Sequence, residues 1–320
     1  MLELMRGLTD VAFERRFGTE EACLAALSTA RQAAGMVCSD CGNQKNYVYG
    51  RRVGCTRCDR RWSLTSGTVM SDTKLPLSCW FRAMHLVTST KQGISSVELG
   101  RRLGVSYPTA WYMNKRLRHA MTERGERHQL GTAPTDGSAR PTVEADDVYL
   151  GGERNQGSGT AGKIRVIAAC ERTAGGGMGY VMMKVVESFT AAHVAAFRHA
   201  HIAPGAQVHT DGLRAFAAFA DPAVQTTHQA TVTGAKRPDR KRGSPFFWVN
   251  TAIANLSTAI KATYKAASAK HLPDYLGAFC WTTNHRRNMS GMIDAACRAI
   301  ATSTALTRKA VYAPIVGATG

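Results

Sequence analysis

Two Cys-X-X-Cys motifs, Cys38–Cys41 and Cys55–Cys58, restrict the fold of this chain more than any other feature. Thirteen residues separate the motifs, which is enough for a short hairpin that brings the two pairs of thiols face to face. Four thiolates at the corners of a tetrahedron are a preferred ligand set of structural Zn²⁺. The spacing therefore predicts a zinc ribbon in which Cys38, Cys41, Cys55 and Cys58 bind one ion. The alternative is that these cysteines are buried thiols or are joined in disulfides.

Basic side chains crowd around these motifs, and the whole chain shares their charge. It has 41 Lys and Arg residues against 23 Asp and Glu residues, a formal net charge of +18. Such an excess favours a polyanionic partner, of which a nucleic-acid backbone is the commonest. We predict that Arg57, Arg60 and Arg61 contact DNA. A membrane surface is the competing partner, but we find no apolar run long enough to span a bilayer and predict no membrane partner.

The first residues, Met1–Phe13, lack the basic and then apolar pattern of a secretory signal. We therefore expect the chain to stay in a reducing cytoplasm, where disulfides are rare. The nine cysteines are then metal ligands and free thiols. Five of them lie in apolar surroundings and are expected to be small core residues: Cys23, Cys79, Cys170, Cys280 and Cys297.

Three regions precede the linker. Residues 1–35 are predicted to be helical, with Thr19 as the cap of a helix that begins with two acids. Residues 36–72 are predicted to form the zinc ribbon. Residues 73–122 have the pattern of three helices, with a tight turn at Gly104 before the last one, which is typical of a helix-turn-helix motif. The alternative is a three-helix bundle with a solvated basic face. The candidate DNA contacts are Tyr107, Thr109, Tyr112, Lys115 and Arg116.

The periodicity changes after a polar linker at residues 123–141. Three alternating segments joined by short turns predict an antiparallel meander, after which helices and short strands alternate. This order predicts an α/β domain with a mixed sheet over residues 142–290. Residues 291–320 are apolar and rich in Ala and Thr, and predict only a C-terminal tail. The expected strands are 142–150, 163–171, 180–187, 206–210 and 225–228, and the expected helices are 190–202, 212–219, 250–265 and 271–285.

Two aspartates of this region are candidates for chemistry. Asp146 is one of three acids, with Glu144 and Asp147, in an otherwise apolar strand, although Asp is a poor strand former. Asp146 shares a face of this strand with Glu144, and Asp147 takes the other face. Asp211 stands at the predicted carboxyl end of a later strand, where open α/β sheets build their sites. If the two strands are neighbours, the two carboxylates can share Mg²⁺ or Mn²⁺, which prefer oxygen ligands. The alternative makes Asp211 a helix N-cap and Asp146 one half of an ion pair.

Several segments together resemble the ISXO-like family of bacterial insertion-sequence transposases, over about residues 12–288. The zinc motifs are similar to the family's CPxCG…CxxC ribbon, with Ser39 in place of its Pro. The strand Val143–Gly152 is similar to the family's VExDExYxGG strand. The other segments that carry the resemblance are Thr65–Val69, Leu75–Phe81, Leu103–Trp111, His209–Gly212 and Trp248–Leu256.

The resemblance implies a ribonuclease-H-like domain that follows a zinc ribbon and a helix-turn-helix. It implies that Asp146 and Asp211 are catalytic ligands of Mg²⁺ or Mn²⁺. It also implies that Asn255 supplies a third ligand, as in a branch of the family that has Asn in place of Glu. The implied activity is cleavage of the ends of the insertion sequence and strand transfer into target double-stranded DNA. By analogy, the enzyme works as a homo-oligomer on DNA, in the nucleoid of a bacterial cytoplasm.

The chain departs from the family pattern at four positions near the expected site. It has Ser257 instead of Lys, Lys265 instead of His, Ala278 instead of Glu and Thr282 instead of Arg. Three interpretations stay open: an active transposase, a decayed copy that keeps the fold and the DNA binding, and a DNA-binding regulator without chemistry.

Overall fold

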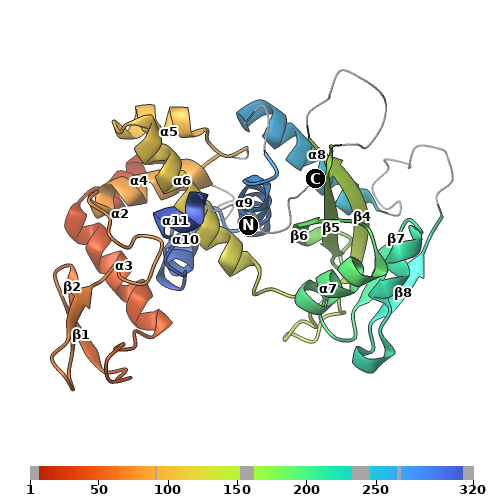
Figure 1. Ribbon diagram of the computed structural model, residues 1–320, viewed down its shortest axis with the longest axis horizontal. Coiled ribbons are helices and arrows are strands. Elements are labelled where there is room, and N and C mark those ends of the chain that lie inside the picture. The colour runs from red at the N-terminus through yellow and green to blue at the C-terminus, as the bar shows by residue number, and fades with distance from the viewer. Residues whose placement is uncertain (1–6, 91, 152–161, 233–245, 265–267, 313–320) are drawn as a thin grey trace. The chain divides into compact units, whose positions relative to one another are not determined.

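The computed structural model describes residues 7–90, 92–151, 162–232, 246–264 and 268–312 (Figure 1). The chain forms two compact units. Unit 1 combines Met1–Arg124 with His285–Ala313, and unit 2 contains Gly125–Asn284. In sequence, unit 2 therefore lies between two parts of unit 1. Lys265, one of the departures from the family pattern, lies outside the described residues.

Two helices begin unit 1, α2 (Asp10–Phe17) and α3 (Glu20–Ala34). The hydroxyl of Thr19 accepts a hydrogen bond of 3.2 Å from the backbone N–H of Ala22, which satisfies one of the free donors in the first turn of α3. This contact confirms the cap predicted at Thr19.

The zinc ribbon is a three-stranded antiparallel sheet of β1 (Asn46–Tyr49), β2 (Arg52–Cys55) and β3 (Arg61–Ser63), in that order. Successive side chains of a strand point to opposite faces of the sheet. Val53 at the centre is fully buried, whereas its neighbour Arg52 is exposed. The ribbon predicted from the cysteine spacing is therefore present, with one covered and one open face.

Three helices follow the ribbon, as the sequence predicts: α4 (Leu77–Thr88), α5 (Ser96–Leu103) and α6 (Tyr107–Gly125). The turn between α5 and α6 begins at Gly104, which has φ of +66°. This left-handed conformation favours glycine because it strains residues with a Cβ atom. The short helix, the turn and the longer helix follow one another in the order predicted for a helix-turn-helix.

The C-terminal residues complete unit 1, although the sequence predicts only a tail there. Helix α10 (Met292–Ala301) is buried except at Asp294 and Arg298, and α11 (Arg308–Tyr312) follows it. The guanidinium of Arg31 donates to the carbonyl oxygen of Ala301 at 2.8 Å, and Arg16 pairs with Asp294 at 2.6 Å. Helix α10 therefore packs into the core that the N-terminal helices form.

Unit 2 is built on a mixed five-stranded sheet in the order β6-β5-β4-β7-β8. Strands β4, β5 and β6 are antiparallel, whereas β7 and β8 run parallel to β4. An antiparallel meander extended by two parallel strands is the mixed sheet expected for a ribonuclease-H-like domain. The strands are β4 (Thr142–Leu150), β5 (Ile164–Arg172), β6 (Met178–Val186), β7 (Gln207–Thr210) and β8 (Thr227–Ala230).

Helices cover both faces of this sheet, so unit 2 has two apolar cores. One core lies under α8 (Phe247–Ala259) and α9 (Leu272–His285), and a π-helical turn, η3 (Ile260–Tyr264), follows α8. The other lies under α7 (Ala191–His201) and the short 3₁₀ helix η1 (Arg214–Phe219), and a second short 3₁₀ helix, η2 (Pro222–Val224), precedes β8. Burial on both faces holds the central strands rigidly, which fixes any side chain carried at their ends.

Candidate metal centres and nucleic-acid interface

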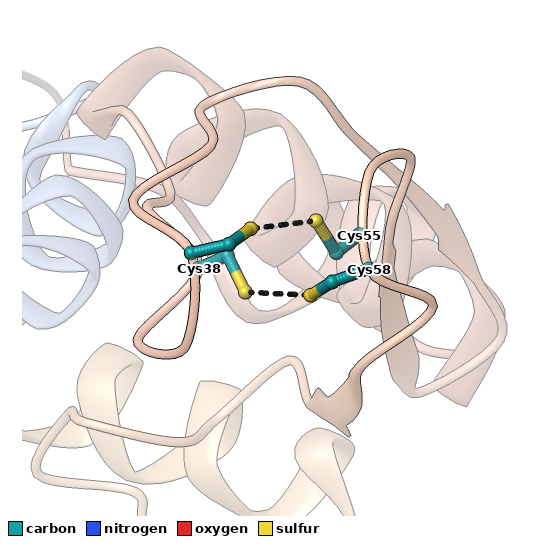
Figure 2. A group of neighbouring side chains, drawn as sticks. Cys38, Cys55 and Cys58 are labelled. Carbon is teal, nitrogen blue, oxygen red and sulfur yellow. Dashed lines mark hydrogen bonds between the residues drawn. The ribbon is translucent and has the colours of Figure 1, made fainter.

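The four cysteines of the ribbon converge on one point. Their sulfur atoms all lie within 4.8 Å of one another. The Sγ atoms of Cys38 and Cys58 are 3.6 Å apart, as are those of Cys41 and Cys55. Figure 2 shows the sulfur atoms of the labelled Cys38, Cys55 and Cys58 turned toward a common centre. Tetrahedral Zn²⁺ with bonds of about 2.3 Å holds its sulfurs roughly 3.8 Å apart, so the geometry fits zinc.

Hydrogen bonds to sulfur prepare this cluster for a cation. The side-chain amide of Asn43 donates to Cys55 Sγ at 3.4 Å, and the backbone N–H of Arg57 donates to the same atom at 3.3 Å. These two donors lower the pKa of Cys55 to about 6. A backbone hydrogen bond from Arg60 lowers the pKa of Cys58, but the neighbouring sulfurs outweigh it and raise that pKa to about 12. Four thiolates at these distances therefore need a bound cation, and the donor set identifies it as structural Zn²⁺.

The second cluster lies in unit 2, at the point where the pairing between two neighbouring strands ends. Strand β4 pairs in parallel with β7, and the last pair in register is Ala145 with Thr210. The residues that follow this pair are Asp146, within β4, and Asp211, directly after β7. The condition set by the sequence, that the two strands be neighbours, is therefore met. Oxygen atoms of Asp146, Asp147 and Asp211 lie within 4.8 Å of one another.

Asp147 is the member of this cluster that sequence reasoning missed. Strand alternation places it on the face opposite Asp146. On the β7 side the pairing of β4 ends one residue before Asp146, whereas β5 still pairs with both Asp146 and Asp147. Oxygen atoms of the two carboxylates nevertheless lie within 4.8 Å of each other and of Asp211. The backbone N–H of Asp147 donates to Oδ1 of Asp146 at 2.9 Å. Two adjacent acids in the middle of a central strand were the available signal.

The carboxylates in this cluster repel one another. Burial, then the nearby charges of Asp211 and Asp147, raise the pKa of Asp146 to about 7. Burial and Asp211 also raise the pKa of Asp147. A divalent cation relieves this repulsion, and an all-oxygen donor set fits Mg²⁺ or Mn²⁺.

Glu144 ties helix α8 to the strand that carries Asp146. Its side chain is only 4% exposed, and Oε2 accepts hydrogen bonds from the backbone N–H groups of Trp248 and Val249, at 3.0 and 3.1 Å. These groups belong to the first turn of α8, where N–H donors have no partner within the helix. Burial raises the pKa of Glu144, although the two N–H groups act in the opposite direction. Glu144 therefore fixes α8 against β4, on the face of the sheet that Asp146 shares.

Helix α8 carries Asn255, the residue that the family resemblance suggests as a third ligand. The side chain is exposed, one residue before the buried Leu256. The residues Phe247–Ala259 include no Asp or Glu. In this chain α8 can therefore offer a neutral oxygen from Asn255 but no carboxylate. Of the departures from the family pattern, Ser257, Ala278 and Thr282 are half-buried.

His228 on β8 supports the strand that leads to Asp211. Its Nε2 atom is 2.8 Å from the hydroxyl oxygen of Thr210, which is fully buried. Burial, and then the nearby His209, lower the pKa of His228. A neutral imidazole bonded to Thr210 therefore braces the end of β7, one residue before Asp211.

The arginines of the ribbon lie where DNA could reach them. Arg57, Arg60 and Arg61 are all exposed, and Arg60 forms an ion pair with Asp40. This pair, near the zinc cluster, reduces the charge that Arg60 offers to a phosphate.

On α6, the residues proposed for DNA contact differ in accessibility. Tyr107 is 56% exposed, whereas Thr109, Tyr112 and Lys115 are half-buried. Thr109 and Tyr112 line a pocket of about 440 Å³ beside the first turns of the helix, together with basic residues that include Lys74. The first turns of α6 therefore combine an exposed aromatic ring with a basic cavity.

Arg116 differs from the prediction. It is only 9% exposed, and its guanidinium lies over the ring of Tyr112, 4.3 Å from the ring centre. The guanidinium also donates to the carbonyl oxygens of Ser71 and Leu306, at 3.1 and 3.3 Å. These contacts within unit 1 occupy the donors that a DNA phosphate would use. Arg116 is therefore a structural residue in this conformation.

None of the described helices is both long enough and apolar enough to cross a membrane.

The comparisons with known proteins agree with this arrangement. Residues 138–284 match the model of the ISXO2-like transposase domain, and residues 18–61 match that of the transposase zinc-ribbon domain. No curated protein matches the chain. With the match to the transposase domain, the mixed sheet and its clustered aspartates form a ribonuclease-H-like transposase domain, and the four-cysteine sheet is its zinc ribbon. The two matches, one over the mixed sheet and one over the ribbon, identify the chain as an ISXO2-like transposase, as its sequence motifs predict.

Proposed function

We propose that this transposase binds the ends of its insertion sequence and catalyses metal-dependent DNA cleavage and strand transfer. The observation that carries the proposal is the convergence of Asp146, Asp147 and Asp211 where the pairing of β4 with β7 ends. A divalent metal held there would polarise the scissile phosphate and activate water or a 3′-hydroxyl.

The residues of the chain divide the remaining work. Asp146 and Asp211 supply charged oxygen ligands from two rigid strands, and we assign them the catalytic role. Asn255 adds a neutral ligand from α8, which Glu144 holds against β4. A neutral amide oxygen offers a dipole instead of a charge, so this third ligand binds more weakly than a carboxylate.

DNA binding is assigned to unit 1. The exposed Arg57 and Arg61 of the ribbon and the exposed Tyr107 of α6 support this assignment. The net charge of +18 favours binding to DNA phosphates. Pairing of two DNA ends requires more than one active site, so we propose that the chain works as a homo-oligomer on chromosomal DNA.

A decayed copy is the second candidate, because specific observations favour it. The described helix α8 has no acid, and Ser257, Ala278 and Thr282 replace a Lys, a Glu and an Arg of the family pattern. A copy of this kind would bind DNA through unit 1 without cutting it.

A cleavage assay separates the two candidates. The substrate is the DNA that flanks the reading frame, with Mg²⁺ or Mn²⁺, and the proteins are the native chain, Asp146→Asn and Asp211→Asn. We expect the native chain to cut at the element ends, and each variant to cut on the order of a thousandfold more slowly with unchanged DNA binding. Asp136→Asn, at an exposed loop position of unit 2, is the matched control and should cut normally. If none of the four proteins cleaves the DNA although all of them bind it, the chain is a decayed copy.

A further inference from the structure

The open face of the ribbon has an unusual composition. Cross-strand pairing aligns Tyr47 with Gly54 and Gly54 with Arg61, and it aligns Tyr49 with Arg52 and Arg52 with Ser63. Apart from Gly54, every side chain of these two rows is exposed. The six positions that share this face are aromatic, basic or small, and none is acidic: Tyr47, Tyr49, Arg52, Gly54, Arg61 and Ser63.

The two tyrosines form a stacked pair on this face. Tyr47 is 45% exposed and Tyr49 is 38% exposed, and their ring centres are 5.6 Å apart with an angle of 30° between the planes. The core of the ribbon does not require these rings, because the apolar residues Val48, Val53 and Trp62 are paired in register on the other face. The rings are therefore left open to a partner.

Gly54 lets the ring of Tyr47 lie flat on the sheet. A Cβ atom at this position would be 2.4 Å from Cζ of Tyr47, closer than any real contact. Glycine is a poor residue for the middle strand of a sheet unless something must approach its backbone. At Gly54 the approaching group is the aromatic ring of Tyr47. The glycine in β2 therefore leaves the space that this ring occupies.

Arginines flank the stacked rings. The guanidinium carbon of Arg61 is 6.0 Å from the ring centre of Tyr49, and Arg52 is paired with Tyr49 across the strands. Aromatic rings that take up base faces, with nearby cations that take up phosphates, are the components of a surface that binds single-stranded nucleic acid. A duplex offers its phosphates to such a surface but keeps its base faces stacked inside. The exposed rings therefore favour unpaired bases over a duplex.

We infer that the open face of the zinc ribbon binds single-stranded DNA, with bases stacked on Tyr47 and Tyr49 and phosphates held by Arg52 and Arg61. The inference rests on the proposed binding of DNA by unit 1, but it does not depend on cleavage. The inference adds single-stranded DNA as a ligand, besides the duplex ends that the proposed function requires.

The experiment measures the affinity of the full chain for two labelled DNAs, an oligothymidylate and a duplex hairpin, by fluorescence anisotropy at one fixed salt concentration. Tyr47→Ala and Tyr49→Ala should each weaken binding to the single strand by roughly 5- to 150-fold, the loss typical of one stacked base. The affinity for the hairpin should stay unchanged. Tyr47→Phe and Tyr49→Phe keep the ring and should retain single-strand binding. Tyr180→Ala is the matched control, because that tyrosine is 41% exposed in unit 2.

A second variant tests the position of the rings without removing any of them. Gly54→Val retains both tyrosines and all arginines but displaces the ring of Tyr47, and should weaken single-strand binding alone. Zinc content, measured for every variant, identifies a ribbon that has failed to fold. A 2-aminopurine in the single strand should lose fluorescence on binding to the native chain and not on binding to the Tyr47→Ala, Tyr49→Ala double variant.

Two results would overturn the inference. One is unchanged single-strand affinity in the zinc-loaded double variant, which would leave the arginines as the whole site. The other is an equal loss for single strand and hairpin, which would assign the tyrosines to phosphate contacts. Absence of hairpin binding by the native chain, with single-strand binding intact, would instead contradict the proposed function and leave this inference standing.

Discussion

The two metal-binding clusters obtain their ligands in opposite ways. In the ribbon, the ligands come from two turns of one short segment, Cys38–Cys58. In unit 2, Asp146 and Asp211 are distant in the sequence, and only the pairing of β4 with β7 brings them together. The ribbon has a three-stranded sheet with short strands, whereas the sheet of unit 2 is covered on both faces.

This difference determines what each ion does for the fold. A small sheet buries too little apolar surface to be stable alone, so zinc binding supplies much of the folding free energy of the ribbon. In unit 2, two apolar cores hold the carboxylates together before an ion arrives, and burial together with the charges of Asp211 and Asp147 raises the pKa of Asp146. The zinc site therefore forms only when zinc binds, whereas the metal site of unit 2 is preformed by the folded sheet.

The largest effect is expected from removing zinc. Cys55→Ser, or treatment with a chelator, should unfold the ribbon, since structural zinc contributes on the order of 10 kcal/mol in small zinc domains. Zinc stoichiometry and limited proteolysis across residues 36–64 would show the change. Cys79→Ser, at a half-buried cysteine outside the cluster, is the control. If the metal-free ribbon resists the protease, zinc is not needed for its folding, and the contrast between the two metal sites fails.

A smaller loss is expected when α8 is released from β4. Glu144→Ala removes the acceptor for the N–H groups of Trp248 and Val249 and leaves them buried. Unit 2 should lose about 2 to 4 kcal/mol of unfolding free energy, measured by urea denaturation. Glu144→Gln keeps one acceptor oxygen and should lose less. Equal, negligible losses in both variants would show that packing alone positions α8.

The metal-free carboxylate cluster should respond to pH. The folded-state pKa of Asp146, about 7, lies above its ordinary value. Its contribution to stability is therefore present at low pH and is lost as the pH rises through about 7. Asp146→Asn should stabilise the metal-free protein at pH 8 by on the order of 2 kcal/mol, and the difference should shrink toward pH 4.

Thermal denaturation, with and without Mg²⁺, measures this effect. Added Mg²⁺ should raise the melting temperature of the native chain at pH 8 more than that of Asp146→Asn. The Asp136→Asn control should behave like the native chain at every pH. A variant that is less stable than the native chain in the absence of metal would show that the carboxylates do not repel one another.

The smallest effect is expected at Glu20 in unit 1. Glu20 accepts hydrogen bonds from the first turn of α4, as Glu144 does from the first turn of α8. Its two carboxylate oxygens accept hydrogen bonds from the N–H groups of Leu77 and Ser78, both at 2.9 Å. These hydrogen bonds outweigh partial burial and lower the pKa of Glu20. Glu20→Gln should cost about 1 kcal/mol or less at pH 7, and the cost should fall below the ordinary pKa of Glu, where the native side chain protonates as well. Chemical denaturation at both pH values provides the measurement, and an increasing cost at low pH would contradict it.

The sequence predicted the ribbon well because the information is local. Four ligands within one short segment leave few arrangements, and Thr19 and Gly104 satisfy local backbone rules. The pairing of Asp146 with Asp211 needed the order of the strands, which periodicity does not contain. The resemblance to a known family supplied that order.

Two features could not be predicted because they depend on distant partners. The helical pattern of α6 places Arg116 next to the outward side of the helix. In the structure its guanidinium is buried, because it donates hydrogen bonds to the carbonyl oxygens of Ser71 and Leu306. Helix α10 has an Ala-rich sequence with no clear boundary, and it is defined by its packing against α3 and α4. Long-range contacts of this kind leave no signal in a single sequence.

The return of α10 to unit 1 has a consequence for synthesis. During translation, the N-terminal part of unit 1 is synthesised first, and all of unit 2 follows it. Helix α10 (Met292–Ala301) is synthesised only afterwards. Until then, the side chain of Arg31 and the backbone N–H of Val69 lack the partners they have in the finished protein, Ala301 and Ser303. A message broken inside the region that encodes unit 2 thus yields a product whose N-terminal core stays open. These contacts of the N-terminal core can therefore form only after unit 2 has been synthesised.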